Sequence, residues 1–354
     1  MKNKILGSIF IIFISSVGLI NILMPDKEIS TSERRKLATF PEFSLSSAWI
    51  EKVDKYLLDQ FVLRDDFRSL KATYNYKVLK KLDNNQISIK DDYIFKSNYP
   101  TNKDSIDNFN KKIQKLSSLL SSDNKQYLMI IPDKNYYYGE GDFLQLDYEY
   151  IYDQVKLDTA EVIDIRDVLN LEDYYKTDTH WRQERLSKVV ERMNEKMQFG
   201  NVKNSYKKHT YDKFYGVYAG ESAIKSKGEK LTYLTNSAIE KAKVTYLENP
   251  KLTNVYNEDK LTGLDSYEVY LDGASAFIEI YNEEATTDKE LVIFRDSFGS
   301  SLAPLLVDKY KKITIIDNRY ITSEVFTQYI EFTNQDVLFM YSTLVVNESG
   351  SLKG

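Results

Sequence analysis

The sequence predicts an α/β fold, in which helices cover a mostly parallel sheet, and two observations carry this prediction. Short apolar runs recur, as in strands buried on both faces of a parallel sheet: YLMIIP (127–132), VIDI (162–165), LVIF (291–294), ITIID (313–317) and VLFMY (337–341). Helical stretches separate several of these runs, notably residues 183–197 and 304–310. Alternation of strands and helices is typical of an α/β sandwich.

The remaining segments predict a hairpin, further helices and an insertion. Residues 86–95 alternate in polarity and predict a hairpin. Residues 104–120 and 47–82 carry apolar side chains at helix spacing, and we interpret the second stretch as a helical pair. Residues 200–285 are polar and rich in Lys and Tyr, with strand-like pieces, and we expect a β-rich insertion there.

The N-terminus predicts a membrane anchor. An uncharged run from Ile5 to Met24 follows Lys2 and Lys4, and at ~1.5 Å per residue it spans ~30 Å, the thickness of a bilayer core. A cleaved signal peptide is the alternative. The length of the run, and the lack of a small-residue cleavage site after it, favour an uncleaved transmembrane helix. The two lysines should remain in the cytoplasm, which places the rest of the chain outside the cell membrane.

Three regions follow from these patterns. We expect a transmembrane anchor at residues 1–24, a stalk and helical region at 25–82, and the main domain at 83–354, with the insertion at about 200–285.

Composition excludes several kinds of chemistry. The chain has 354 residues, no cysteine and only two histidines. Thiol catalysis, disulfides and Cys-ligated zinc are therefore excluded, and a His-rich metal site is disfavoured. The net charge of −5 and the lack of a basic cluster argue against a nucleic-acid partner. We expect no cofactor and no metal.

A serine follows one of the predicted core strands. Ser297 lies in the turn after the run 291–294, and ligands of open α/β sheets bind outside the carboxyl ends of strands. Its backbone N–H, in a tight turn beside Gly299, can point at an oxyanion. A Ser-Gly turn without chemistry is the alternative.

The segment YYKTDTHW, residues 174–181, holds the residues that such a serine needs. Serine requires a base within hydrogen-bond reach, and the ordinary pKa of histidine, ~6.5, suits His180 to that task. Asp178, two positions earlier, can orient the imidazole, and we expect Trp181 to pack behind the ring. A turn histidine without chemistry is the alternative, because the sequence does not show whether Ser297 and His180 meet.

The same segment resembles the Y-x-x-D-x-H-W signature of the DHHW protein family, whose relatives include the SGNH-like alginate O-acetylation proteins AlgJ and AlgX. Other family segments occur in order between residue 31 and about 345: SERRKLATFPEFS, DQFVLRDDF, ISIKDDYIF, IPDKNYYY, DKFYGVYAG, VIFRDSFGSSLAPLL and ITIIDNRY. The chain departs from the family pattern at Val62, where proline is usual, and at Thr179, where histidine is frequent.

The resemblance implies an SGNH-like three-layer α/β/α sandwich with Ser297 as nucleophile, His180 as base and Asp178 as its orienting carboxylate. Four more residues are candidates for the oxyanion hole or for substrate binding: Gly216, Arg319, Lys134 and Tyr267. We expect the second histidine, His209, to be a solvated loop residue.

The function that the resemblance implies is acetyl transfer at the cell surface. An acyl-serine would pass acetyl to hydroxyl groups of an exported polysaccharide, and a membrane-bound O-acyltransferase would supply the acetyl group. Two alternatives remain open: a polysaccharide acetylesterase with the same triad, and a non-catalytic polysaccharide-binding or scaffold protein of the acetylation machinery.

Overall fold

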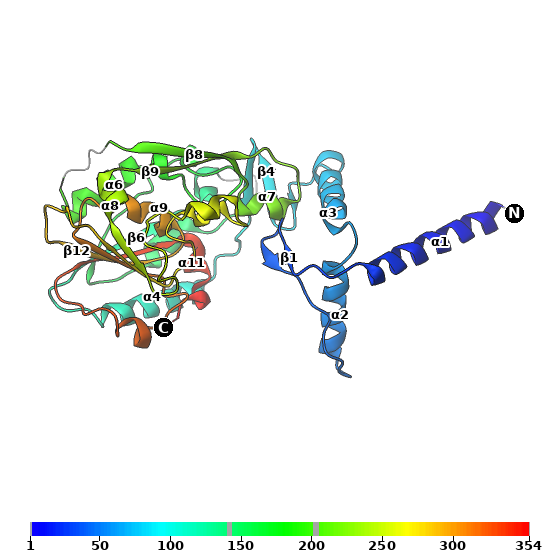
Figure 1. Ribbon diagram of the computed structural model, residues 1–354, viewed down its shortest axis with the longest axis horizontal. Helices are drawn as coiled ribbons and strands as arrows, with labels where there is room; N and C mark the ends of the chain where they lie inside the picture. The colour runs from blue at the N-terminus through cyan, green and yellow to red at the C-terminus, as the bar shows by residue number, and fades with distance from the viewer. Residues whose placement is uncertain (1, 140–143, 201–204, 354) are drawn as a thin grey trace. The chain divides into compact units, whose positions relative to one another are not determined.

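The computed structural model describes residues 2–139, 144–200 and 205–353, and the chain divides into two compact units. The first unit comprises residues 1–85 and 219–226, and the second comprises residues 86–218 and 227–354. Each unit is described by itself (Figure 1).

The first unit consists mainly of helices. Its apolar helix α1 (Lys2–Leu23) contains one candidate membrane span, Lys4–Leu23, by length and composition, a test that a signal sequence also passes. The other elements are the antiparallel pair β1 (Ile29–Ser30) and β2 (Arg35–Lys36), the helices α2 (Ser47–Asp59) and α3 (Arg64–Thr73), the π-helical turn η1 (Tyr74–Val78) and β3 (Asp83–Asn84). Ser46 caps α2 by accepting a hydrogen bond from the Trp49 N–H, at 3.2 Å. The predicted helical pair is therefore present.

The second unit is built on a seven-stranded sheet in the order β10-β11-β13-β12-β14-β6-β7. Its strands are β6 (Lys125–Ile131), β7 (Ala160–Val162), β10 (Lys243–Tyr246), β11 (Phe277–Tyr281), β12 (Glu290–Arg295), β13 (Lys312–Ile316) and β14 (Asp336–Ser342). The pairs from β13 through β12, β14 and β6 to β7 are parallel, whereas β11 is antiparallel to both neighbours. The predicted α/β fold with a mostly parallel sheet is confirmed.

Helices and short turns connect these strands. The hairpin is β4 (Ile87–Lys90) with β5 (Tyr93–Lys96), and a second antiparallel pair is β8 (Lys207–Phe214) with β9 (Glu229–Thr235). The α-helices are α4 (Lys103–Ser117), α5 (Tyr148–Gln154), α6 (Ser187–Met197), α7 (Val217–Ser222), α8 (Ser237–Lys241), α9 (Phe298–Leu302), α10 (Ser323–Phe326) and α11 (Thr343–Asn347). The 3₁₀ turns are η2 (Lys134–Tyr137), η3 (Leu171–Asp173), η4 (Gln183–Arg185), η5 (Glu258–Thr262), η6 (Ser266–Val269), η7 (Ala303–Leu306) and η8 (Ser349–Ser351).

The sheet is buried on both faces, which makes the second unit a three-layer sandwich. Side chains alternate across a strand, and in β12 Leu291 and Ile293 belong to one hydrophobic cluster while Val292 and Phe294 belong to the other. Apolar side chains of α6 complete the first cluster and those of α4 complete the second.

Two expectations differ from the structure. The run 162–165 is not a strand as a whole, because β7 covers only Ala160–Val162. The strand lies at the sheet edge with Val162 exposed, and the buried Ile163 and Ile165 belong to the connection that leaves the sheet. The expected insertion 200–285 contains the pair β8 and β9, but also β10 and β11, which belong to the central sheet.

Candidate active site

The loop before Trp181 is closed on itself and fixes Asp178 against His180. The Tyr175 N–H donates to the His180 carbonyl at 3.1 Å, so residues 175–180 form a short loop whose ends are joined. Asp178 Oδ1 lies 2.6 Å from His180 Nδ1 and accepts the His180 backbone N–H at 3.0 Å. Asp178 Oδ2 accepts the Val217 N–H at 2.9 Å. Both carboxylate oxygens are therefore held in place.

Residues from other elements support this loop. Lys134, at the start of η2, donates from Nζ to the carbonyls of Tyr175, Lys176 and Asp178, at 3.2, 3.1 and 2.7 Å. Glu229 accepts the Lys176 and Thr177 N–H groups at 2.9 and 2.8 Å, and it also accepts the Thr177 hydroxyl. The loop is thus held by the Lys134 amino group on its carbonyls and by the Glu229 carboxylate on its amides.

Ser297 lies in the turn between β12 and α9. The buried Asp296 shapes this turn, because its carboxylate accepts the Phe298 N–H at 3.0 Å and the Ser342 N–H at 2.7 Å. The second bond ties the end of β12 to the end of β14, its parallel neighbour. The Ser297 backbone N–H donates to no group in the described part of the chain. It is therefore available to an oxyanion.

The two segments meet at the carboxyl edge of the sheet. Ser297 Oγ lies 2.7 Å from His180 Nε2, within the range that we expect for a serine and its base. A carboxylate only accepts hydrogen bonds, so His180 Nδ1 carries the proton and Nε2 is free to accept the Ser297 hydroxyl. Asp178, His180 and Ser297 thus form one continuous hydrogen-bonded line.

The imidazole is held between two aromatic rings. Tyr267, on η6, stacks on His180 with ring centroids 3.9 Å apart and planes 7° from parallel, and Phe298 lies 5.0 Å away. The Tyr267 hydroxyl donates to Ser301 Oγ at 2.8 Å, and the Trp181 indole N–H donates to the same oxygen at 2.9 Å. Trp181 was expected behind the imidazole, but Tyr267 stacks on that ring and Trp181 packs edge-on against Phe298.

Burial and neighbouring charges shift the pKa values of Asp178 and Lys134. Burial by itself raises the pKa of Asp178, but the charge of His180 and the hydrogen bonds from His180 and Val217 outweigh it and hold the pKa below its usual range. Burial lowers the pKa of Lys134 to about 7, although the charges of Asp178 and Glu229 oppose this effect. Asp178 is therefore ionised at neutral pH.

Gly216 is not an oxyanion donor in this structure. Its N–H donates to Thr177 Oγ1 at 2.9 Å. A Cβ at this position would lie 2.2 Å from the Thr177 carbonyl oxygen and 2.4 Å from Asp178 Cβ. Glycine is required because the backbone after β8 passes directly against the loop that carries Asp178.

The three other candidates for the oxyanion hole or substrate binding also make contacts different from those expected. Lys134 and Tyr267 are buried, so they do not line an open pocket: Lys134 holds the loop and Tyr267 positions the imidazole. Arg319 forms a two-point ion pair with the buried Asp317, at 2.9 and 2.6 Å. No contact within the described ranges joins Arg319 to Asp178, His180 or Ser297.

His209 is not a solvated loop residue. It lies on β8, stacks on Tyr233 with ring centroids 4.8 Å apart, and places Nε2 3.0 Å from Thr235 Oγ1. These side chains line a cleft of about 260 Å³ together with residues of α8, η5 and the segment before η5.

Sequence reasoning missed Asp296 and Glu229 as positioning residues. Asp296 had a local signal, because an aspartate directly before a turn serine can cap the turn with its own carboxylate. Glu229 had none, since it lies far along the chain from Thr177 and only the fold brings them together. Thr179, where the family often has histidine, keeps its hydroxyl buried without a hydrogen-bond partner in the described part of the chain.

Comparisons with solved structures place the fold. A DHHW family protein from Eubacterium siraeum matches with a TM-score of 0.60 and 20% identity, over 77% of this chain and 97% of its own. Bacillus cereus PatB1 matches with a TM-score of 0.61 and 19% identity, over 74% of this chain and 97% of its own. The chain has the fold of these proteins.

A further solved structure matches, whereas comparisons by sequence find no relative. A PatB1 structure that carries a sulfonyl adduct matches with a TM-score of 0.59 and 20% identity, over 73% of this chain and 97% of its own. No protein-family model matches the sequence, and no curated protein matches it significantly.

Proposed function

We propose that this chain is an O-acetyltransferase that transfers acetyl through Ser297 to hydroxyl groups of a polysaccharide outside the cytoplasm. The observation that carries the proposal is the continuous line of Asp178, His180 and Ser297, with 2.6 Å and 2.7 Å between the paired atoms. The fold shared with the DHHW family protein and with PatB1 supports this proposal.

The reaction has two steps. Ser297 Oγ attacks the carbonyl carbon of an acetyl ester while its proton passes to His180 Nε2, and the oxyanion faces the Ser297 N–H. The ester bond then breaks, and the leaving oxygen takes the proton from His180. An acceptor hydroxyl next gives its proton to His180 and attacks the acyl carbon. The bond between that carbon and Ser297 Oγ then breaks, and His180 returns the proton to Oγ. Asp178 stabilises the imidazolium in both steps.

The acetyl donor and the site of action follow from the same proposal. We infer that α1 is an uncleaved single-pass anchor and that the catalytic unit lies outside the cell membrane. Cytoplasmic acyl donors do not reach such a site, so a membrane-bound O-acyltransferase is the partner that would deliver acetyl.

A covalent label tests the nucleophile. The detergent-solubilised full chain is treated with methanesulfonyl fluoride, and intact mass and peptide mapping follow. We expect one sulfonyl group on Ser297 and loss of acetyl-ester hydrolysis. The variants Ser297→Ala and His180→Ala should not be labelled, whereas Ser301→Ala should be labelled, because Ser301 contacts Trp181 and Tyr267 rather than His180. Labelling of other residues at equal rates would rule out an activated Ser297.

A second assay separates transfer from hydrolysis. An activated acetyl ester is offered together with candidate oligosaccharides. Acetylated sugar that disappears in Ser297→Ala supports transfer, whereas free acetate alone supports an acetylesterase. Full polymer acetylation in cells that carry Ser297→Ala would instead support a scaffold protein.

A further inference from the structure

We propose that α2 and α3–η1 carry an interfacial face that lies on the lipid bilayer beside the outer end of α1. The interfacial face consists of Leu57, Leu58, Phe61, Leu63, Phe67, Leu70, Tyr74 and Val78. The inference rests on the proposal that α1 is retained as an anchor, and it is independent of the catalytic proposal.

The first observation is an exposed apolar stripe along α3 and η1. Leu63, Phe67, Leu70, Tyr74 and Val78 follow one another at steps of three or four residues, which places them on one side of a helix. Each of these side chains is between 52% and 65% exposed. The stripe is therefore turned away from the rest of the first unit.

The end of α2 extends the same surface. Leu57, Leu58 and Phe61 are also exposed. The ring of Phe61 meets that of Phe67 with centroids 5.8 Å apart, so the apolar side chains of the two helices form one continuous patch. A patch of this kind on a soluble surface marks a site that contacts protein or membrane.

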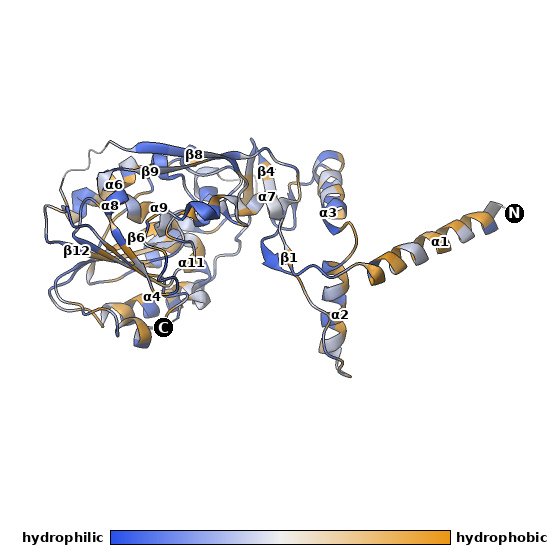
Figure 2. Ribbon diagram, in the orientation of Figure 1, coloured by the Kyte–Doolittle hydropathy of each residue, from blue (hydrophilic) through white to orange (hydrophobic). Residues whose placement is uncertain are grey.

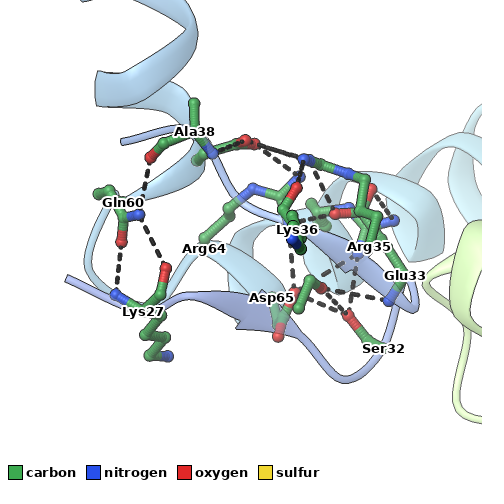
Figure 3. A network of polar contacts seen from close by, with 12 residues as sticks. Lys27, Ser32, Glu33, Arg35, Lys36, Ala38, Gln60, Arg64 and Asp65 are labelled. Carbon is green, nitrogen blue, oxygen red and sulfur yellow. Dashed lines mark hydrogen bonds and ion pairs between the residues drawn. The ribbon is translucent and has the colours of Figure 1, made fainter. Parts of the chain in front are cut away.

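The opposite side of these helices is already occupied. Asp59 accepts two hydrogen bonds from Arg35, at 2.8 and 2.6 Å, and Arg64 pairs with Glu33 at 2.7 Å. Figure 3 shows this network between the helices and the segment around β1 and β2. Ala72, on the side of α3 opposite the stripe, is fully buried. The polar sides of α2 and α3 thus hold the first unit together, whereas their apolar sides are exposed.

A single hydrogen bond locates the patch relative to the candidate span. The Val62 N–H, between α2 and α3, donates to Asn21 Oδ1 at 2.7 Å. Asn21 lies in the last turn of α1, which ends at Leu23. The apolar span Lys4–Leu23 covers ~30 Å at 1.5 Å per residue, so Asn21 lies where the hydrocarbon meets the headgroups. The junction of α2 and α3 lies at the same depth.

The directions of the helices and the neighbouring charges favour lipid as the occupant. Within the first unit, the axis of α1 runs across those of α2 and α3 (Figure 1), as it must if α1 crosses the bilayer and the other two lie along its surface. Figure 2 shows α1 as mostly apolar, whereas α2 and α3 carry both colours. Exposed lysines flank and follow the stripe, at Lys71, Lys77, Lys80 and Lys81. Amphipathic helices with basic flanks bind anionic lipid surfaces.

The experiment measures whether lipid or water surrounds the patch. The native chain has no cysteine, so a single introduced cysteine can be labelled uniquely with a nitroxide. Phe67→Cys and Leu70→Cys test the patch. Lys52→Cys is the matched control, since Lys52 is exposed on the side of α2 opposite Ile50 and Leu57. The full chain is placed in nanodiscs of phosphatidylcholine and phosphatidylglycerol, and collision rates with oxygen and with a water-soluble nickel chelate are measured.

We expect the ratio of oxygen to nickel collisions to be several-fold higher at positions 67 and 70 than at position 52. Unchanged thermal unfolding of each variant shows that the fold is kept. Equal ratios at all three positions would overturn the proposal. The patch would then be a candidate surface for a protein partner instead of lipid. Release of residues 1–24 from the full chain in cells would overturn it as well, because no span would then hold the patch at the bilayer.

Discussion

At the scale of single residues, contacts on several sides fix the orientation of the His180 ring. Asp178 binds Nδ1, Ser297 meets Nε2, and Tyr267 covers one face of the ring. The contacts thus fix the orientation of the imidazole in advance, as the proposed role of His180 as a general base requires.

The first prediction concerns Asp178→Asn. The amide supports the wrong imidazole tautomer and does not stabilise the imidazolium, so we expect kcat for acetyl-ester hydrolysis to fall by about 10⁴ while the fold is kept. Steady-state kinetics and thermal unfolding measure the two effects. A rate within tenfold of the parent would contradict the role of Asp178.

The second prediction compares two changes at Tyr267. Tyr267→Phe keeps the stacked ring and loses one neutral hydrogen bond, worth ~1 kcal/mol, so the rate should fall by less than about tenfold. Tyr267→Ala removes the support of the imidazole and leaves a cavity that costs ~3–5 kcal/mol of stability. If the ring positions His180, Tyr267→Ala should reduce kcat by a larger factor than it changes KM. The kinetics should be measured well below the unfolding temperature of the variant. Equal kinetics for the two variants would exclude this positioning role.

At the scale of elements, the geometry of the candidate site depends on how segments pass one another. The backbone after β8 runs against the Asp178 loop at Gly216, and η2 places Lys134 beneath the same loop. Each contact predicts a different failure when it is changed.

The third prediction is Gly216→Ala. The added Cβ would meet backbone atoms of Thr177, which yield less readily than a flexible side chain. We expect a loss of stability of ~1–3 kcal/mol and a strong loss of activity, because Asp178 must move. Gly350→Ala is the control, since a Cβ there meets nothing within 4 Å. Similar thermal unfolding and rates for both variants would show that the close approach is not needed.

The fourth prediction is a pH dependence of stability. Burial lowers the pKa of Lys134 from its ordinary 10.5 to about 7, so the unfolded chain binds more protons than the folded chain between these values. Stability conferred by this group therefore rises with pH across that window, approaching ~1.4 kcal/mol per pH unit. Lys134→Met removes the effect, and titrations of other groups cancel when the two proteins are compared. Thermal unfolding should show that the stability of the parent relative to Lys134→Met is greater at pH 9.5 than at pH 7.5. The same difference in stability at both pH values would contradict the prediction.

At the scale of the whole molecule, the fifth prediction concerns topology. With α1 retained and Lys2 and Lys4 in the cytoplasm, the rest of the chain lies outside. Protease added to intact spheroplasts should digest it, and the full-length chain should fractionate with membranes. A protected chain, or a shortened soluble form, would show that the anchor proposal is wrong.

The sequence by itself determined most elements and the chemistry available to them. Four of the five predicted core strands lie where the apolar runs placed them, because strands buried on both faces need such runs. The edge strand β7 was misplaced, because the buried residues after it, including Ile163, continue the apolar pattern after the chain has left the sheet. The strands β10 and β11 were expected in an insertion, but they pair with the central sheet. Asp178, His180 and Ser297 were recognisable because each residue type, and the spacing of the first two, suits one chemical role.

Only the tertiary structure decided which of these residues meet. His180 and Ser297 are 117 positions apart, and their contact depends on parallel strands ending at one edge of the sheet. Gly216 was a candidate oxyanion donor on local grounds, but its N–H donates to the Thr177 hydroxyl, which the fold brings within 2.9 Å. In the same way Tyr267 rather than the adjacent Trp181 stacks on His180. Local patterns specify elements and reactive groups, whereas packing between distant segments selects each partner.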